Sequence, residues 1–137
     1  MDVLIDTTVW SLGLRRRRRD LNPAEVKVYF QWEYLLKQGD ATLIGPIRQE
    51  VLSGIASIQE FTSLAARLDT IPDLPISQST FVLAAEFFNL CRSHGTAAGS
   101  IDMTICAASR EFDLPIFTTD PDFQFYARHL PIKLFRP

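Results

Sequence analysis

The sequence predicts a three-layer α/β/α domain with a central, mainly parallel sheet. The opening segment Val3-Leu4-Ile5 is apolar at every position, which is typical of a strand that helices cover on both faces. Further along, short apolar segments alternate with longer segments of helical periodicity. A chain of 137 residues is long enough for one such domain with a real core, so we expect a single domain over residues 1–137.

The helices of the first half have recognisable ends. After a short helix over 7–14, we expect one that begins at Asn22-Pro23, since Asn caps well and proline suits the first helical position, and that stops at Gly39. A strand over 41–45 follows, then a helix from Pro46 to Gly54 and another over 57–68. The apolar stripe of the helix after Pro23 predicts its inward face, formed by Val26, Tyr29, Phe30, Tyr34 and Leu35.

The second half continues the alternation. Its prolines leave 70–76 as an edge strand at most, and a long helix is expected over 77–92. A helix from Gly99-Ser100 to Phe112, a strand over 114–118, a short helix over 122–128 and a last strand over 132–135 complete the chain. The predicted inward residues of the two longer helices are Phe81, Ala84, Ala85 and Phe88, then Ile101, Ile105, Ala108 and Phe112.

The formal charge of -2 hides one concentrated basic segment. Five of the 14 basic residues are consecutive, which leaves nine basic residues against 16 acidic ones elsewhere. Such a run is most often a solvated loop, because water screens like charges best, but it can also attract phosphate groups. The five residues are Arg15, Arg16, Arg17, Arg18 and Arg19.

Cysteine use and hydropathy bear on the compartment. Cys91 and Cys106 lie in apolar, helix-like segments without a metal-ligand spacing partner, so we expect buried free thiols in a reducing compartment. The residues after Met1 lack the regions of a signal peptide, and no apolar run reaches the ~18 residues that span a bilayer. We therefore expect a cytoplasmic protein with no membrane partner.

Acidic residues occupy the positions where an α/β sheet collects its functional groups. Asp6 ends the first strand, and Asp120 follows a later one, with Asp122 two residues on. Glu50 and Asp102 lie beside inward-facing helix stripes. Each has a structural explanation, as a helix cap, a first-turn acid or a solvated position. A parallel sheet can nevertheless bring all of them to one edge.

A cluster of carboxylates requires an agent that offsets its repulsion. Two carboxylates about 4 Å apart repel by roughly 4 kcal/mol at an effective dielectric of ~20. A divalent cation is the usual agent, and all-oxygen ligands favour Mg²⁺ or Mn²⁺; neither His94 nor His129 has a partner that would make a zinc site. Such a cation can polarise a phosphodiester and lower the pKa of an attacking water. No Ser-His-Asp, Cys-His or glycine-rich phosphate loop competes with it.

The acids lie in four segments, which are in chain order Leu4-Ile5-Asp6-Thr7-Thr8, Gln49-Glu50-Val51-Leu52-Ser53-Gly54, Asp102-Met103-Thr104-Ile105-Cys106-Ala107-Ala108 and Phe117-Thr118-Thr119-Asp120-Pro121-Asp122-Phe123. Together these segments resemble the motifs of PIN-domain ribonucleases, and in particular of the VapC-type toxins of toxin–antitoxin pairs. The match runs nearly the whole chain. Thr8 stands where Asn or Ser is frequent in the family, Cys106 replaces an apolar or Ala position, and the arginine run lies outside the general motif.

The resemblance implies a metal-dependent endoribonuclease that hydrolyses phosphodiester bonds in RNA. It also implies a homodimer and a cognate small antitoxin protein that inserts near the acidic pocket. We add the hypothesis that the run Arg15 to Arg19 contacts the RNA backbone. By position, the implied catalytic acids are Asp6, Glu50, Asp102 and Asp120, the implied ligands of Mg²⁺ or Mn²⁺ are Asp6, Asp102, Asp120 and Asp122, and the supporting hydroxyls are Thr7 and Thr118.

The sequence is also compatible with two other functions. One is a PIN-like module that binds RNA or a protein without cutting, although the full set of acids argues against it. The other is an α/β phosphatase acting on small phosphoesters, which is weaker because the chain lacks both an Asp-x-Asp opening and a cysteine phosphate loop.

Overall fold

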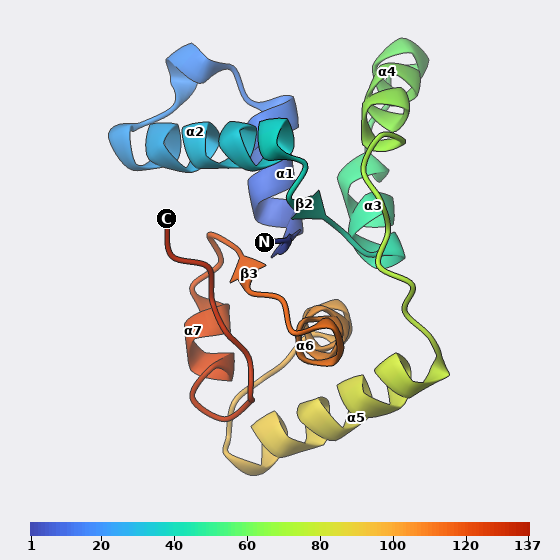
Figure 1. The fold of residues 1–137 in the computed structure, drawn as a ribbon, viewed down its shortest axis with the longest axis vertical. Coiled ribbons are helices and arrows are strands. Elements are labelled where there is room, and N and C mark those ends of the chain that lie inside the picture. The colour runs from blue at the N-terminus through green and yellow to red at the C-terminus, as the bar shows by residue number, and fades with distance from the viewer.

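The computed structural model describes all residues 1–137 and is built on a three-stranded parallel sheet (Figure 1). Strands β1 (Val3–Ile5), β2 (Ala41–Thr42) and β3 (Ile116–Phe117) lie in the order β2-β1-β3. Leu4 pairs with Thr42 on one side and with Ile116 on the other. Because all three strands run the same way, the residues that follow them meet at one edge of the sheet.

Helices cover both faces of this sheet. Figure 1 shows α1 and α2 on one side of it and α6, backed by α5, on the other. The predicted three-layer α/β/α architecture is confirmed. The helices are α1 (Thr7–Arg15), α2 (Pro23–Gln38), α3 (Gly45–Leu52), α4 (Ile58–Leu68), α5 (Gln78–Ser93), α6 (Ser100–Phe112) and α7 (Asp122–Tyr126), with a 3₁₀ turn, η1, over Arg18–Asp20. None of them is both long enough and apolar enough to cross a bilayer.

The first strand is the centre of the core. Val3, Leu4 and Ile5 are at most 1% exposed, as expected for a strand covered on both faces. The indole Nε1 of Trp10 donates a hydrogen bond to the Ile5 carbonyl at 3.0 Å, which fixes α1 against the end of β1. This contact sets the direction in which the residues after β1 leave the sheet.

Segment 70–76, expected as an edge strand at most, makes one isolated bridge, between Leu43 and Asp73, since Pro72 and Pro75 have no N–H to donate to a ladder. The predicted last strand, 132–135, is wrong, because it also contributes only one isolated bridge, between Ile116 and Leu134. Backbone hydrogen bonds from Ile116 to Lys133 and from Phe135 to Ile116 still hold the last segment beside β3.

Several predicted inward faces are wrong in part. On α2, Leu35 is buried as predicted, but Phe30 and Tyr34 are exposed, and Trp32, which was not predicted, is buried. On α5, Phe81 and Ala85 are exposed, while Thr80, Ala84, Phe87 and Cys91 are buried. The α6 helix is buried at every position from Met103 to Ser109, because the sheet and α5 enclose it, whereas Ile101 is partly exposed. Helices with apolar residues on several sides take their rotation from their neighbours, which periodicity does not reveal.

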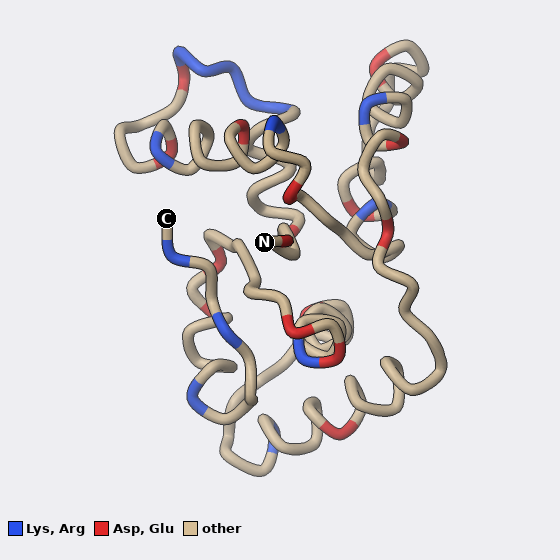
Figure 2. The backbone as a smooth tube through the Cα atoms, in the orientation of Figure 1, with Lys and Arg blue, Asp and Glu red and all other residues tan.

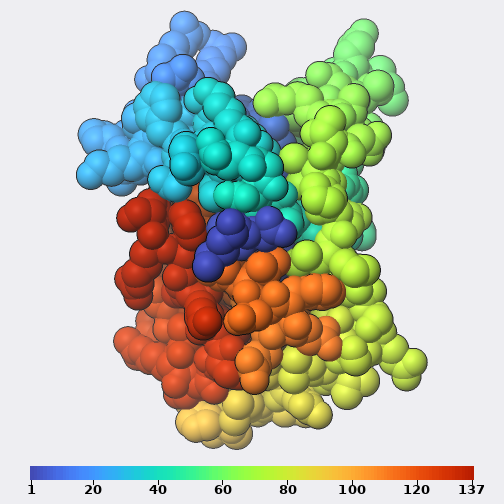
Figure 3. All heavy atoms as spheres, in the orientation of Figure 1, coloured from blue at the N-terminus to red at the C-terminus, as the bar shows by residue number.

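A pair of tryptophans joins α1 to α2. Trp10 and Trp32 meet edge to face with ring centroids 5.9 Å apart, and both are buried. They line a cavity of about 600 Å³ with residues of α4 and the segment after it, where Figure 3 shows the surface hollowed between α2 and α4. The Trp32 Nε1 is buried and has no hydrogen-bond partner.

Gly13 allows this arrangement. A Cβ at position 13 would lie 2.6 Å from the Trp32 ring. We expect Gly13→Ala to lower the free energy of unfolding by about 1–3 kcal/mol through overpacking, partly offset by the better helix propensity of Ala. Urea denaturation measures the change. Gly45→Ala is the matched control, because a Cβ there meets nothing within 4 Å, and it should be neutral. Equal stability of the Gly13→Ala protein and the parent would contradict the steric explanation.

Candidate active site

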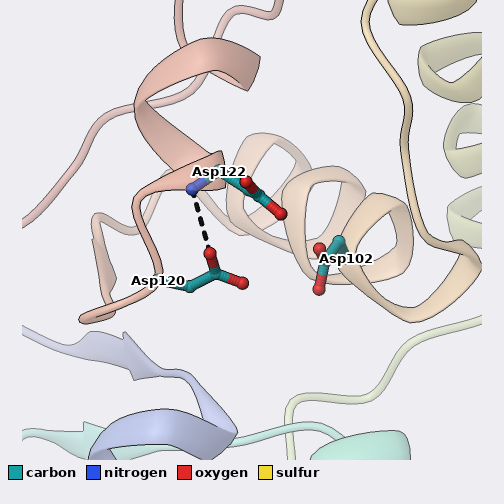
Figure 4. Close-up of side chains that lie close together, drawn as sticks. All are labelled: Asp102, Asp120 and Asp122. Carbon is teal, nitrogen blue, oxygen red and sulfur yellow. Dashed lines mark hydrogen bonds between the residues drawn. The ribbon is translucent and has the colours of Figure 1, made fainter.

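Three aspartates from two separate segments converge at the carboxyl edge of the sheet (Figure 4). Asp102 lies in the first turn of α6, Asp120 in the turn after β3, and Asp122 at the first position of α7. One carboxylate oxygen from each lies within 4.8 Å of the others. The Asp122 N–H donates to Asp120 Oδ1 at 2.9 Å, so Asp120 shapes the turn with one oxygen and keeps the other free.

Asp6 and Glu50 complete the acidic group. Asp6 follows β1, is only 4% exposed, and its Oδ2 accepts hydrogen bonds from the hydroxyls of Thr8 at 2.9 Å and Thr118 at 2.7 Å. Glu50 is exposed on α3, and its Oε1 accepts from the Thr7 hydroxyl at 2.7 Å. The charges of Asp6 and Glu50 both act on Asp102, so both lie near it.

All five acids singled out in the sequence therefore lie at one edge, although only Asp102, Asp120 and Asp122 are close enough to share one ion directly. Asp6 occupies the N-cap position of α1 but makes no side-chain capping bond. Its carboxylate is engaged mainly by the hydroxyls of Thr8 and Thr118.

A layer of threonine hydroxyls orders the site. Thr118 donates to Asp6 and accepts from the Asp120 N–H at 3.0 Å, so a single hydroxyl joins the end of β1 to the turn after β3. Thr8 donates to Asp6 and accepts from the Thr119 N–H at 3.1 Å. From the sequence, Thr8 was noted only because the family often has Asn or Ser at this position. Its two hydrogen bonds at the site were not predicted.

Burial and crowding raise the pKa of two of the acids. Burial raises the pKa of Asp6 despite the hydrogen bonds from Thr118 and Thr8 that lower it. For Asp102, burial is again the largest cause, and the charges of Asp6, Asp120 and Glu50 add to it, raising the pKa to about 6. The carboxylates of Asp6 and Asp102 are therefore stabilised by binding either a proton or a metal cation.

Tyr126 is a site residue that the sequence did not reveal. It is buried on α7, and its hydroxyl donates to Asp102 Oδ2 at 2.8 Å. Burial and this hydrogen bond raise the pKa of Tyr126, so the phenol stays protonated and can donate. From the sequence, a tyrosine in a short helix is expected to be part of the hydrophobic core. No sequence pattern connects Tyr126 with Asp102, which lies 24 positions earlier.

The donor set suits a hard divalent cation. Carboxylates alone point to Mg²⁺ or Mn²⁺, and no histidine or cysteine takes part. The three carboxylate oxygens lie within 4.8 Å of one another, so side-chain rotations would bring them to the separations that one such ion requires. Asp102, Asp120 and Asp122 can therefore hold such an ion, and Tyr126 leaves Asp102 Oδ1 free for it.

The arginine run does not join this cluster. It follows α1, whose other end carries Asp6, and Figure 2 shows it as a basic stretch at the outer end of α1 and α2. All five arginines are exposed, as expected. Arg16 forms an ion pair with Glu25 at 3.1 Å, and the other four have no ion-pair partner.

The raised pKa of Asp102 predicts how the metal-free protein responds to pH. The folded state holds the proton more tightly than the unfolded chain, whose carboxyl titrates near 3.8. The stabilisation is complete below that value and is lost as the pH rises through about 6. Urea unfolding in EDTA should therefore give a lower free energy of unfolding at pH 7 than at pH 5. Asp102→Asn should reduce this slope, whereas Asp69→Asn, at an exposed position on α4's C-cap, should keep it. A slope unchanged by Asp102→Asn would contradict the assignment.

Tyr126→Phe tests the hydrogen bond to Asp102. Phe retains the ring that packs edge to face on Phe123 at 5.1 Å, and it removes only the hydroxyl. Because loss of such an outer partner typically costs 10–100-fold in metal affinity, we expect Mn²⁺ to bind at least about tenfold more weakly by calorimetry, at an unchanged melting temperature. Tyr34→Phe, on the exposed side of α2, is the control. Equal Mn²⁺ affinity in both variants would show that the hydroxyl does not orient Asp102.

Known proteins with this fold provide an independent comparison. The FitAcB crystal structure from Neisseria gonorrhoeae has 20% sequence identity and a TM-score of 0.71, over 98% of this chain and 97% of that one. A structure of FitAB bound to an IR36 DNA fragment gives 19% identity and a TM-score of 0.73, over 97% and 93%. VapBC2 from Rickettsia felis, bound to a DNA fragment from its promoter, gives 15% and 0.72, over 98% of each chain.

At these identities the likeness to solved structures establishes the fold. No curated protein matches the chain significantly. The model of the PIN domain family, however, matches residues 3–128, which include every acid of the site and Tyr126. The resemblance seen in the sequence is thereby confirmed, and the chain belongs to the PIN domain family.

Proposed function

We propose that the chain is a divalent-metal-dependent endoribonuclease and the toxin component of a toxin–antitoxin pair. PIN domains are generally nucleases, and this chain belongs to that family. The observation that carries the proposal is the convergence of Asp102, Asp120 and Asp122 beside Asp6 and Glu50 at the carboxyl edge of the sheet. Mg²⁺ or Mn²⁺ held there would supply the positive charge that stabilises a phosphodiester under attack by water.

The residues of the site have separable tasks in this proposal. Asp102, Asp120 and Asp122 would hold the ion, and Asp6, whose Oδ2 is fixed by Thr8 and Thr118, would add negative charge close to it. Glu50 is exposed, and Thr7 occupies only its Oε1, so Oε2 is available to accept the proton of the attacking water.

The substrate class follows from the family resemblance and suits the shape of the site. Asp122 and Glu50 are exposed, so the acids line an open edge rather than a closed pocket. An extended single strand can lie across such an edge and bring one phosphate to the ion. We therefore propose single-stranded or looped RNA as the substrate.

The partner proposal rests on the structural neighbours and on one surface. The similar structures of FitAB and VapBC2 are bound to DNA fragments, that of VapBC2 to one from its promoter. Because the family resemblance implies a cognate antitoxin, we propose that this chain also works with one. We also propose a homodimer, supported by exposed apolar side chains on α5, among them Phe81 and Val82.

Removal of one carboxylate tests the nuclease. We expect the protein to cleave single-stranded RNA with Mg²⁺ or Mn²⁺ and not in EDTA, and we expect Asp120→Asn to lower the rate by at least about 100-fold, because an ion ligand is lost. Either ion should also raise the melting temperature of the parent more than that of Asp120→Asn. Asp69→Asn is the control of equal charge change. Cleavage that persists in EDTA would refute the metal-dependent mechanism, and RNA binding without cleavage would identify a non-cutting module.

A further inference from the structure

We propose that a hollow beside the arginine run, lined by Arg18, Arg19, Leu21, Val26, Tyr29 and Phe30, binds one nucleotide of single-stranded RNA at a distance from the cut phosphate. This inference rests on the proposed function, because it assigns a second contact to the same substrate. The hollow has a volume of about 330 Å³, at the small end of the range for small-ligand sites.

Local interactions fold the arginine run back onto α2 and so form the hollow. Asn22 and Glu25 make a reciprocal capping box, with Asn22 Oδ1 accepting from the Glu25 N–H at 2.8 Å and Glu25 Oε1 accepting from the Asn22 N–H at 3.1 Å. Glu25 Oε2 accepts from Arg16 at 3.1 Å. One glutamate therefore holds both the start of α2 and the beginning of the basic segment.

Arg18 and two aromatic rings form the stacking surface. The Arg18 guanidinium carbon lies 4.8 Å from the centroid of the Phe30 ring and 5.3 Å from that of Tyr29. Phe30 is 47% exposed although it is a large apolar residue. Flat aromatic rings and guanidinium planes are the surfaces on which unpaired bases stack, and such stacking tolerates any base.

The charge of the segment suits a phosphate group. Five arginines against Asp20 give a net charge of +4 over residues 15–20, whereas the nine basic and 15 acidic residues in the rest of the chain give −6. Arg18 and Arg19 form no ion pair within the chain and both line the hollow, so their N–H donors are free. A nucleotide offers both a planar base and an adjoining phosphate, and this combination matches the hollow better than the carboxylate side chain of an acidic peptide does.

The position of the hollow is compatible with one strand that also reaches the acids. Helix α1 leads from Asp6, directly before it, to Arg15 at its end, and its nine residues span about 13 Å; the hollow lies beyond Arg15. A single strand that reaches both places must therefore extend over more than the length of α1, which requires several nucleotides. The outer contact would add affinity without touching the reacting phosphate.

RNA binding by separate variants tests the subsite. With a fluorescein-labelled single-stranded RNA of about 12 nucleotides in EDTA, we expect Phe30→Ala to raise the Kd by at least about fivefold, through lost stacking. Arg18→Ala should raise the Kd and reduce the slope of log K against log salt by about 1, whereas Arg18→Lys should restore the slope but not the full affinity. In cleavage with Mg²⁺, both alanine variants should raise KM and leave kcat unchanged.

Controls and outcomes separate this inference from the proposed nuclease. Arg92→Ala on α5 and Phe61→Ala on α4 remove exposed side chains of the same types elsewhere and should leave the Kd unchanged. Cleavage with unaltered KM and Kd in the Arg18 and Phe30 variants would overturn the subsite and leave the nuclease intact. Absent cleavage with the predicted losses of binding would refute the nuclease and support the subsite. Losses confined to binding of a partner protein would identify a protein interface and overturn the RNA assignment.

Discussion

The Thr118 hydroxyl is the contact on which the site most depends. It donates to the buried Asp6 and accepts from the Asp120 N–H, so it connects the first strand with a turn more than 110 residues later. Parallel pairing of β1 and β3 brings these groups within reach, because both strands end at the same edge. Without that pairing, the acids would belong to distant parts of the chain and would have no common geometry.

The acidic site is held together at an electrostatic cost. Asp6 is buried, Asp102 is crowded by three other carboxylates, and no arginine or lysine of the chain pairs with any of them. Hydroxyl donors from Thr8, Thr118 and Tyr126 order the oxygens without neutralising them. Neutral donors leave the negative charge available to a cation, whereas an internal salt bridge would compete with it.

Local sequence patterns predicted the architecture and the acids of the site. The all-apolar run Val3-Leu4-Ile5 identified the central strand, and the position of acids after strands identified Asp6 and Asp120. The rotation of α2 and α5 was not predictable, because several of their sides are apolar and only the packed partners choose among them. Tyr126 and Thr8 were not predicted as site residues for a related reason. Their roles come from hydrogen bonds to Asp102 and Asp6 in the folded chain, and such contacts produce no periodic pattern in the sequence.

The order of these residues along the chain has a consequence for synthesis. Helix α7 supplies both Asp122 and the tyrosine that orients Asp102, and it is synthesised after the domain's other helices. A nascent chain that ends just before Asp122 contains all three strands and helices α1 to α6, but it lacks both the third aspartate of the cluster and the tyrosine that orients Asp102. The acidic centre is thus complete only when translation of the domain is nearly finished, after the sheet and the other six helices have been synthesised.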